Sequence, residues 1–165
     1  MAEFLQWPDP RLSAVAEPVR DITDDIRAIW DDMILKMDAM PGVGLAAPQL
    51  GIGLRLAVVD ASAARGQAVR MANPEIISTS PQMQENEEAS PNLPGFSAKI
   101  KRPNLVSVRF LNKDGVIDRR DFEGLWAASM LHQIDHLNGR LYFDNLSRTK
   151  RAMFVKKLSK RGSRF

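Results

Sequence analysis

The chain has 165 residues, of which 44% are hydrophobic and 26% are charged, and its formal net charge is +3. This size and composition predict one compact domain spanning residues 1–165 around a single core. Cysteine is absent, which excludes disulfides, thiolate metal ligands and thiol nucleophiles together. No apolar run approaches the roughly 20 residues of a membrane span, and residues 1–4 lack the basic-then-apolar order of a signal peptide. We therefore expect a cytoplasmic protein with no membrane partner.

The N-terminal part predicts an extended arm followed by a helix. Two prolines between residues 7 and 12 fix extended or turn geometry. Thr23 is suited to cap the following helix, because its hydroxyl can accept a hydrogen bond from a free amide and two acidic residues come directly after it. Apolar side chains then recur at helical spacing until Pro41-Gly42, which predicts the helix end: Ile26, Ile29, Trp30, Met33, Met37 and Met40.

The middle of the chain predicts short strands. Residues 42–49 contain two glycines, which is typical of a tight connector whose backbone approaches another group closely. Apolar and β-branched residues predict strands over 54–59, 69–74 and 75–78, with a turn after the second. Residues 82–88 are polar and acidic, which favours a loop or the edge of a sheet.

A β-hairpin and a buried helix are predicted between residues 105 and 139. The segments 105–110 and 116–120 flank Asp114-Gly115, a pair that favours the tight turn of a hairpin. Residues 122–137 contain no proline, and Asn138-Gly139 provides a typical helix stop. The apolar stripe of this helix comprises Leu125, Trp126, Met130, Ile134 and Leu137.

The C-terminal segment, residues 148–165, is basic. It contains no acidic residue, and its bases are Arg148, Lys150, Arg151, Lys156, Lys157, Lys160, Arg161 and Arg164. We expect a helix over 147–158 that buries Ala152, Met153 and Val155. The bases can dock on a phosphate-rich surface such as ribosomal RNA. A solvated helix end is the alternative interpretation.

Two histidines, the only ones in the chain, stand four residues apart at His132 and His136. On a helix this spacing stacks both imidazoles on one face, as in the zinc-hydrolase signature H-E-x-x-H. The residue after the first histidine is Gln133, whose amide cannot accept a proton at neutral pH, so the proton-transferring half of the signature is missing. Because a metal needs a third protein ligand, the pair is equally consistent with two buried histidines satisfied by hydrogen bonds.

Three separated segments resemble the motifs of the peptide deformylases. Residues 42–49 read GVGLAAPQ and fit the first family motif, GxGLAAxQ. Residues 88–96 read EASPNLPGF and are similar to the second, EGCLS followed by an apolar residue, proline and glycine. Residues 131–139 read LHQIDHLNG and are similar to the third, QHExDHLxG. The order and spacing of these segments agree over most of the chain.

The resemblance implies an α+β, peptide deformylase-like fold with small antiparallel sheets around a central helix that carries both histidines. It also implies a metal-dependent hydrolase that removes the formyl group from the N-terminal methionine of nascent proteins. In this family a divalent metal (iron, zinc or nickel) is held by the cysteine of the second motif and both histidines of the third. The glutamate beside the first histidine transfers the proton. The glutamine of the first motif and the N–H after the cysteine bind the oxyanion.

Two of the family's metal ligands match this chain, and the third does not. His132 and His136 correspond to the ligating histidines, whereas the family cysteine corresponds to Ser90, whose neutral hydroxyl is a weak ligand. By the same resemblance, the substrate is expected to lie against Gly42, Val43, Gly44, Leu45, Glu88 and Arg102. An ion pair with a neighbouring acid is the alternative role of the arginine.

Two of the three catalytic positions also depart from the family. Gln49 matches the oxyanion donor, but the second donor falls on Pro91, which has no N–H. The catalytic glutamate falls on Gln133, which is not a base. Losing a general base typically costs about 10²- to 10⁴-fold in rate, and losing one oxyanion donor about 10²- to 10³-fold.

The leading interpretation is a monomeric, deformylase-like protein that has lost or nearly lost its activity and still binds a methionyl or formyl-methionyl N-terminus. The second is an active metal-dependent amide hydrolase, in which Ser90 or water completes the coordination and Glu87, Glu88 or Asp135 serves as the base. The third is a ribosome-associated binding module that acts through residues 148–165.

Overall fold

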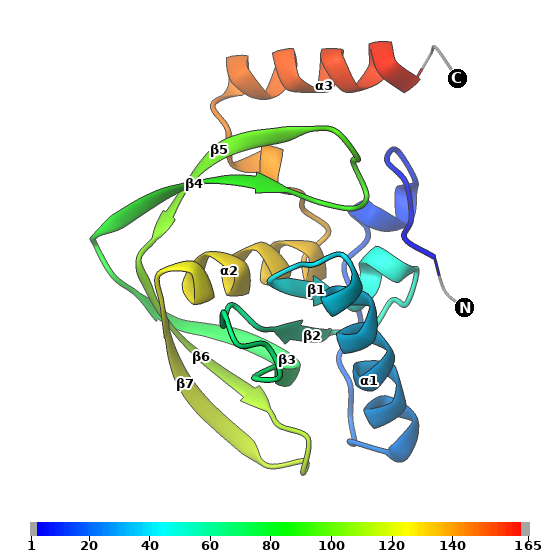
Figure 1. Ribbon diagram of the computed structural model, residues 1–165, viewed down its shortest axis with the longest axis vertical. Helices are drawn as coiled ribbons and strands as arrows, with labels where there is room; N and C mark the ends of the chain where they lie inside the picture. The colour runs from blue at the N-terminus through cyan, green and yellow to red at the C-terminus, as the bar shows by residue number, and fades with distance from the viewer. Residues whose placement is uncertain (1–2, 163–165) are drawn as a thin grey trace.

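The computed structural model describes residues 3–162, with helix α2 (Leu125–Leu137) at the centre of the molecule (Figure 1). A five-stranded antiparallel sheet and a two-stranded antiparallel hairpin lie on opposite sides of this helix. The sheet has the order β1 (Gly44–Ala46), β2 (Leu56–Val59), β3 (Val69–Thr79), β6 (Leu105–Leu111) and β7 (Ile117–Glu123). The hairpin consists of β4 (Met83–Ala89) and β5 (Ser97–Pro103). This arrangement confirms the predicted α+β fold class.

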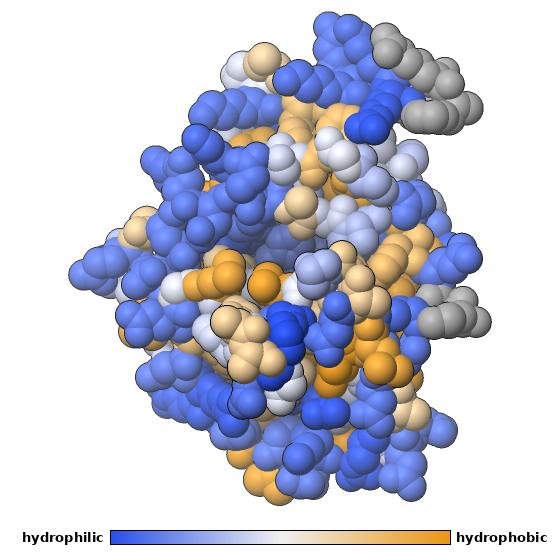
Figure 2. Space-filling model, in the orientation of Figure 1, coloured by the Kyte–Doolittle hydropathy of each residue, from blue (hydrophilic) through white to orange (hydrophobic). Residues whose placement is uncertain are grey.

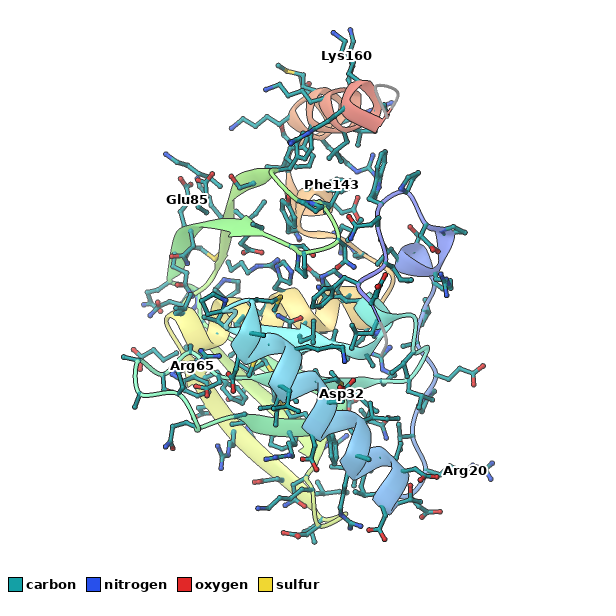
Figure 3. All side chains as sticks on the ribbon, turned by 45° about the vertical axis from the view of Figure 1, so that its right-hand side comes forward. Arg20, Asp32, Arg65, Glu85, Phe143 and Lys160 are labelled. Carbon is teal, nitrogen blue, oxygen red and sulfur yellow. The ribbon has the colours of Figure 1, made fainter. Side chains whose placement is uncertain are left out.

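Two further helices pack on the outside. Helix α1 (Asp24–Ala39) contacts β1 and β2 with its apolar face, where Trp30, Met33 and Met37 are fully buried. Helix α3 (Arg148–Gly162) follows the 3-10 helix η3 (Tyr142–Asn145) and lies above the β4–β5 hairpin (Figure 1). Figure 3 shows Phe143 beneath α3, and its ring stacks on that of Phe154 with 5.2 Å between centroids. This contact attaches α3 to η3.

Several predicted elements are confirmed. The Thr23 hydroxyl caps α1 by accepting a hydrogen bond from the Ile26 amide, and α1 ends just before the predicted Pro41-Gly42 stop. Strands β6 and β7 form the predicted hairpin, with Gly115 at a positive φ of 76° in its turn. Helix α2 ends at Leu137, directly before the predicted stop.

The third strand differs from the prediction. The sequence predicts two strands over 69–74 and 75–78, whereas β3 runs unbroken from Val69 to Thr79. The predicted turn is a bulge, because the register with β6 shifts between Ala72 and Glu75, and Asn73 has a φ of 51°. The Asn73 side chain accepts from the Val19 amide and donates to the Val19 carbonyl, so a distant segment holds the bulge in place.

Residues 82–88 take the second of their two predicted forms, the edge of a sheet, and part of the expected connector 42–49 is a strand. Most of 82–88 belongs to β4, which pairs with β5, a strand that the sequence pattern does not predict. Within the expected connector 42–49, residues 44–46 form β1, and Ala47–Leu50 form the 3-10 helix η2. Polar residues form β4 because only one of its faces meets the interior, where Glu88 is buried.

The predicted helix bounds and one set of buried residues also need correction. Helix α2 begins at Leu125 and not at Phe122, because Phe122 pairs with Val106 in the β6–β7 hairpin. In α3, Phe154 and Leu158 are buried, whereas the predicted Ala152 and Met153 are exposed and Val155 is half-buried. Within residues 3–162, no helix has the length and apolar character needed to cross a bilayer.

Candidate active site

A cleft of about 460 Å³ opens between β4, the segment before and within β1, and α2. Figure 2 shows the surface hollowed between the β4–β5 hairpin and the α1–β1 region, with apolar residues along its lower rim. Its apolar lining includes Met40, Pro41, Val43, Leu125 and Ala128. The predicted site residues that line it are Gly42, Val43, Gly44, Gln49, Glu88, Ser90, Pro91, His132 and Gln133. The fold therefore brings residues of all three motifs into one cleft.

The two histidines face one another in the C-terminal half of α2. His132 Nε2 and His136 Nε2 lie 3.1 Å apart, and His132 Nδ1 lies 2.8 Å from Glu88 Oε1. Because the carboxylate accepts, His132 donates through Nδ1. Burial, the neighbouring His132 and the Arg102 charge hold the pKa of His136 well below its ordinary value of 6.5. His136 is therefore neutral at pH 7, and its Nε2 faces that of His132.

A buried network of ion pairs holds the His132 ring in its orientation. Arg102 Nε and Nη2 donate to the two oxygens of Glu88 at 2.6 and 2.8 Å, and Arg102 Nη1 donates to Asp135 Oδ2 at 3.1 Å. Burial opposes ionisation of Glu88, but hydrogen bonds from Arg102 and His132 outweigh it and lower the pKa of this carboxyl. The network orients the histidine ring as a carboxylate partner does in metal sites.

The three carboxylates that could replace the missing base, Glu87, Glu88 and Asp135, all accept hydrogen bonds from other side chains. Both oxygens of Glu88 are bonded to Arg102, and Asp135 Oδ2 also accepts from Asn145 Nδ2 at 2.9 Å. Glu87 lines the cleft, but it is exposed and accepts a hydrogen bond from Ser97 Oγ at 2.6 Å. None of them is a free carboxylate directed at the histidines.

Ser90, Gln49 and Asn92 form a closed hydrogen-bond network on the opposite wall. Ser90 Oγ donates to Asn92 Oδ1 at 2.8 Å and accepts from Gln49 Nε2 at 3.2 Å. Gln49 Nε2 also donates to Asn92 Oδ1 at 2.8 Å, and its Oε1 accepts from the Ala46 amide at 2.9 Å. Asn92 Nδ2 donates to the carbonyls of Leu5 and Gln49. The Gln49 amide group therefore donates to Ser90 and Asn92 inside the protein.

Gln133 occupies the position of the family's base without making a hydrogen bond. Its side chain is 3% exposed, and its Oε1 is one of two buried side-chain polar atoms in residues 3–162 that lack a partner. Its Nε2 faces β1, because a Cβ added to Gly44 would lie only 2.5 Å from it. A Cβ at position 44 would displace the side-chain ends of Ser129 and Gln133, and glycine avoids this.

Three predicted residues lie outside the cleft lining, and two contributors were not predicted. Leu45 is in the core, His136 lies behind His132, and Arg102 is 5% exposed and bound to Glu88 and Asp135. Asn92 accepts hydrogen bonds from both Ser90 and Gln49, and Tyr142 stacks on His132 with 5.9 Å between ring centroids. No sequence signal assigns either role, although the amide at Asn92 departs from the serine of the family's motif.

The site fits two ligands of a metal but not the third. The separation of 3.1 Å between the two histidine Nε2 atoms is close to the roughly 3.3 Å expected for two ligands of a tetrahedral ion with bonds of about 2.0–2.1 Å. Ser90 Oγ is neutral and already makes hydrogen bonds with Gln49 and Asn92. In the part of the chain that the structure describes, no three His, Cys, Asp or Glu side chains are grouped to hold a metal. The three-ligand set of a catalytic site is therefore incomplete.

Comparison with known proteins identifies the family. The polypeptide deformylase family profile matches residues 1–152. A peptide deformylase of Afipia carboxidovorans is 41% identical over 160 residues, which cover 96% of this chain and 94% of the relative. The crystal structure of a peptide deformylase from Legionella pneumophila has a TM-score of 0.88 at 37% identity and covers 99% of this chain and 96% of its own. That of the Ehrlichia chaffeensis enzyme in complex with actinonin has a TM-score of 0.87 at 31% identity, covering 96% and 95%. The chain belongs to the peptide deformylase family, which is a family of metalloenzymes.

Proposed function

We propose that this protein binds methionine-headed N-termini of nascent chains in the deformylase cleft and has lost or nearly lost the ability to remove the formyl group. The proposal rests on the residues at the third-ligand, oxyanion-donor and general-base positions of the family, none of which can perform its role here. The Ser90 hydroxyl is neutral and already makes hydrogen bonds within the protein. Pro91 has no N–H, and the Gln133 amide is not a base. Of the three carboxylates that could replace the base, Glu88 and Asp135 are held by Arg102, and Glu87 is exposed and accepts from Ser97.

Peptide binding is supported by the unpaired edge of β1. This strand ends the larger sheet, so its outer edge is available for an extended peptide to add as a further strand. The Val43 carbonyl accepts from the Asp60 amide on the β2 side, and antiparallel alternation then directs the amide and carbonyl of Gly44 to the open side. The apolar lining beside this edge suits an unbranched side chain such as methionine.

The activity proposal is tested by a steady-state assay with formyl-Met-Ala-Ser. The purified protein, loaded anaerobically with iron, nickel or cobalt, is expected to give a kcat/KM far below the roughly 10⁴ M⁻¹s⁻¹ of ordinary enzymes. A value within about tenfold of that figure would show a working deformylase and refute the proposed loss. Metal analysis of the same samples reports whether the loaded iron, nickel or cobalt is retained, and analysis of the protein as purified reports any zinc.

A second proposal is that α3 docks on the ribosome, which would place the protein in the cytoplasm beside emerging chains. The helix buries Phe154 and Leu158 and exposes Arg148, Lys150, Lys156 and Lys157, without an acidic residue among positions 148–162. Such a one-sided basic surface is suited to phosphate contacts.

The ribosome proposal predicts a loss of co-sedimentation after charge removal. The variant Lys150→Gln/Lys156→Gln/Lys157→Gln keeps the buried contacts of α3 and is expected to reduce ribosome pelleting severalfold at about 100 mM salt, because each phosphate contact contributes to the salt-dependent affinity. Replacing the lysines by arginine instead is the matched control and should preserve pelleting. Unchanged pelleting of the glutamine variant would contradict a role for α3.

A further inference from the structure

A second cavity, of about 300 Å³, lies where the N-terminal arm, the loop between β4 and β5, and the end of α3 come together (Figure 1). We call it the arm cavity. Its polar lining comes from Gln6, Asn92 and Arg161, and its larger apolar lining comes from Trp7, Pro8, Leu93, Pro94, Phe96 and Leu158. This volume is at the lower end of the range for small-molecule sites, so the cavity suits a ligand about as large as one aromatic amino acid.

The arm cavity is distinct from the deformylase cleft, because no residue that the structure describes lines both. Hydrogen bonds within the protein join its walls. The Trp7 amide donates to the Asn92 carbonyl at 2.9 Å, and Gln6 Nε2 donates to the Pro91 carbonyl at 3.2 Å. The walls are therefore fixed by the fold itself, as in a site that is formed before its ligand arrives.

Arg161 gives the arm cavity a positive charge that no carboxylate balances. Its guanidinium lies over the Phe96 ring, 5.1 Å from the centroid, and a Cβ added to Gly95 would collide with its Nη1, so the glycine leaves room for it. Arg161 forms no ion pair with any residue that the structure describes, and none of the described residues in the lining is acidic. Because the ring covers only one face of the guanidinium, the N–H groups in its plane remain able to donate to an anion.

We propose that the arm cavity is a second ligand site, which binds a small carboxylic acid with an aromatic body. The aromatic body packs between Trp7 and Leu158, and the carboxylate accepts hydrogen bonds from Arg161. A neutral molecule of the same shape fills the apolar part and lacks the ion pair, whereas an inorganic anion lacks the apolar contacts. Both parts of the ligand are therefore needed for binding.

Proton–nitrogen correlation NMR of the full chain, titrated with 3-phenylpropionate at neutral pH, tests the proposal. The chain has three tryptophans, whose indole N–H signals are separate reporters. Trp7 lines the arm cavity, whereas Trp30 is fully buried and Trp126 stacks on Phe122. We expect the Trp7 signal, assigned with Trp7→Phe, to shift with a Kd below about 1 mM. The Trp30 and Trp126 signals should stay in place, and inorganic phosphate at the same concentrations should move none of the three.

A neutral analogue and two arginine variants isolate the contribution of the charge. The amide 3-phenylpropanamide is expected to bind the native protein about fivefold more weakly than the acid, which is the upper range for an ion pair at an exposed arginine. Arg161→Met should remove this preference by weakening the acid and leaving the amide unchanged. Arg148→Met is the matched control and should keep the preference, because Arg148 is exposed on the same helix and lies outside the arm cavity.

Four results would overturn the proposal. If the Trp7 signal stays in place while amides of the deformylase cleft such as that of Gly44 shift, the acid binds in that cleft and not in the arm cavity. Absence of any shift at about 5 mM acid would show that the arm cavity holds no such ligand. Equal affinities of the acid and the amide for the native protein, or a preference that survives Arg161→Met, would show that the arginine does not recognise the carboxylate.

Discussion

Returning four positions to the family residues, by Ser90→Cys/Pro91→Leu/Asn92→Ser/Gln133→Glu, is expected to raise kcat/KM for formyl-Met-Ala-Ser at least about a hundredfold. A carboxylate at position 133 restores a general base, which typically contributes about 10²- to 10⁴-fold. A backbone N–H at position 91 restores an oxyanion donor, which contributes about 10²- to 10³-fold. The gains are not expected to multiply, because groups that act together are not independent.

Asn92 belongs in this set for a structural reason. Its Oδ1 accepts from both Ser90 Oγ and Gln49 Nε2, so the asparagine competes with a substrate oxygen for the Gln49 amide. The same variant without Asn92→Ser is therefore expected to recover less activity than the full set. A thiolate at position 90 also adds a third protein ligand beside His132 and His136, so the full variant should retain more metal after dialysis.

The single variant Gln133→Glu is the informative control. Alone it is expected to gain little, because the oxyanion donors and the third ligand are still missing. Recovery of most of the activity by this one change would show that positions 90–92 do not limit the reaction. Failure of the full variant, with its metal bound and its fold intact, would place the cause of inactivity elsewhere in the chain.

Local signals were sufficient to predict the elements that local chemistry determines. The Thr23 cap and the Asp114-Gly115 turn act within a few residues, and both are present in the structure. The bulge at Asn73 could not be predicted, because it is held by hydrogen bonds to Val19, more than fifty residues earlier in the chain. A turn-like Asn-Pro pair alone indicates a strand end, and only the partner strand shows that β3 continues.

The site shows the same division between local and distant determinants. The spacing of His132 and His136 predicts their common helix face, and the structure has both rings in contact. The role of Arg102 could not be chosen from the sequence, because a substrate contact and an ion pair require the same residue. The network of Asn92 depends on its meeting Gln49 and Leu5 across the fold, which no periodicity or spacing expresses.

Removing the buried guanidinium by Arg102→Met is expected to lower the free energy of unfolding at pH 7 by about 3–5 kcal/mol, measured by urea denaturation. Arg102 and Glu88 have side chains that are 6% and 8% exposed, so the variant leaves Glu88 buried without its cation. Such a loss is a large part of the roughly 5–15 kcal/mol that stabilises a typical domain. It would also release His132, because Glu88 orients that ring.

Arg109→Met is the matched control for this prediction. Arg109 pairs with Glu75 at 2.7 Å, but the two side chains are 54% and 63% exposed. Exposed pairs contribute between about 0 and 1 kcal/mol, so this variant is expected to be nearly neutral. Equal costs for Arg102→Met and Arg109→Met would contradict the assignment of a buried network to Arg102.

The pH dependence of stability gives an independent check with a definite sign. In the native protein the pKa of Glu88 lies below its ordinary value of 4.5, so its contribution to stability is complete above that pH and is lost as the pH falls through the lower, folded-state pKa. In Arg102→Met the carboxyl is buried without its cation, which raises its pKa above the unfolded value. Its effect then reverses, and stability decreases as the pH rises above about 4.5. The difference in unfolding free energy between the two proteins should therefore be small near pH 3 and largest at neutral pH, whereas a constant difference would mean that Arg102 stabilises by packing its aliphatic stem and not by its charge.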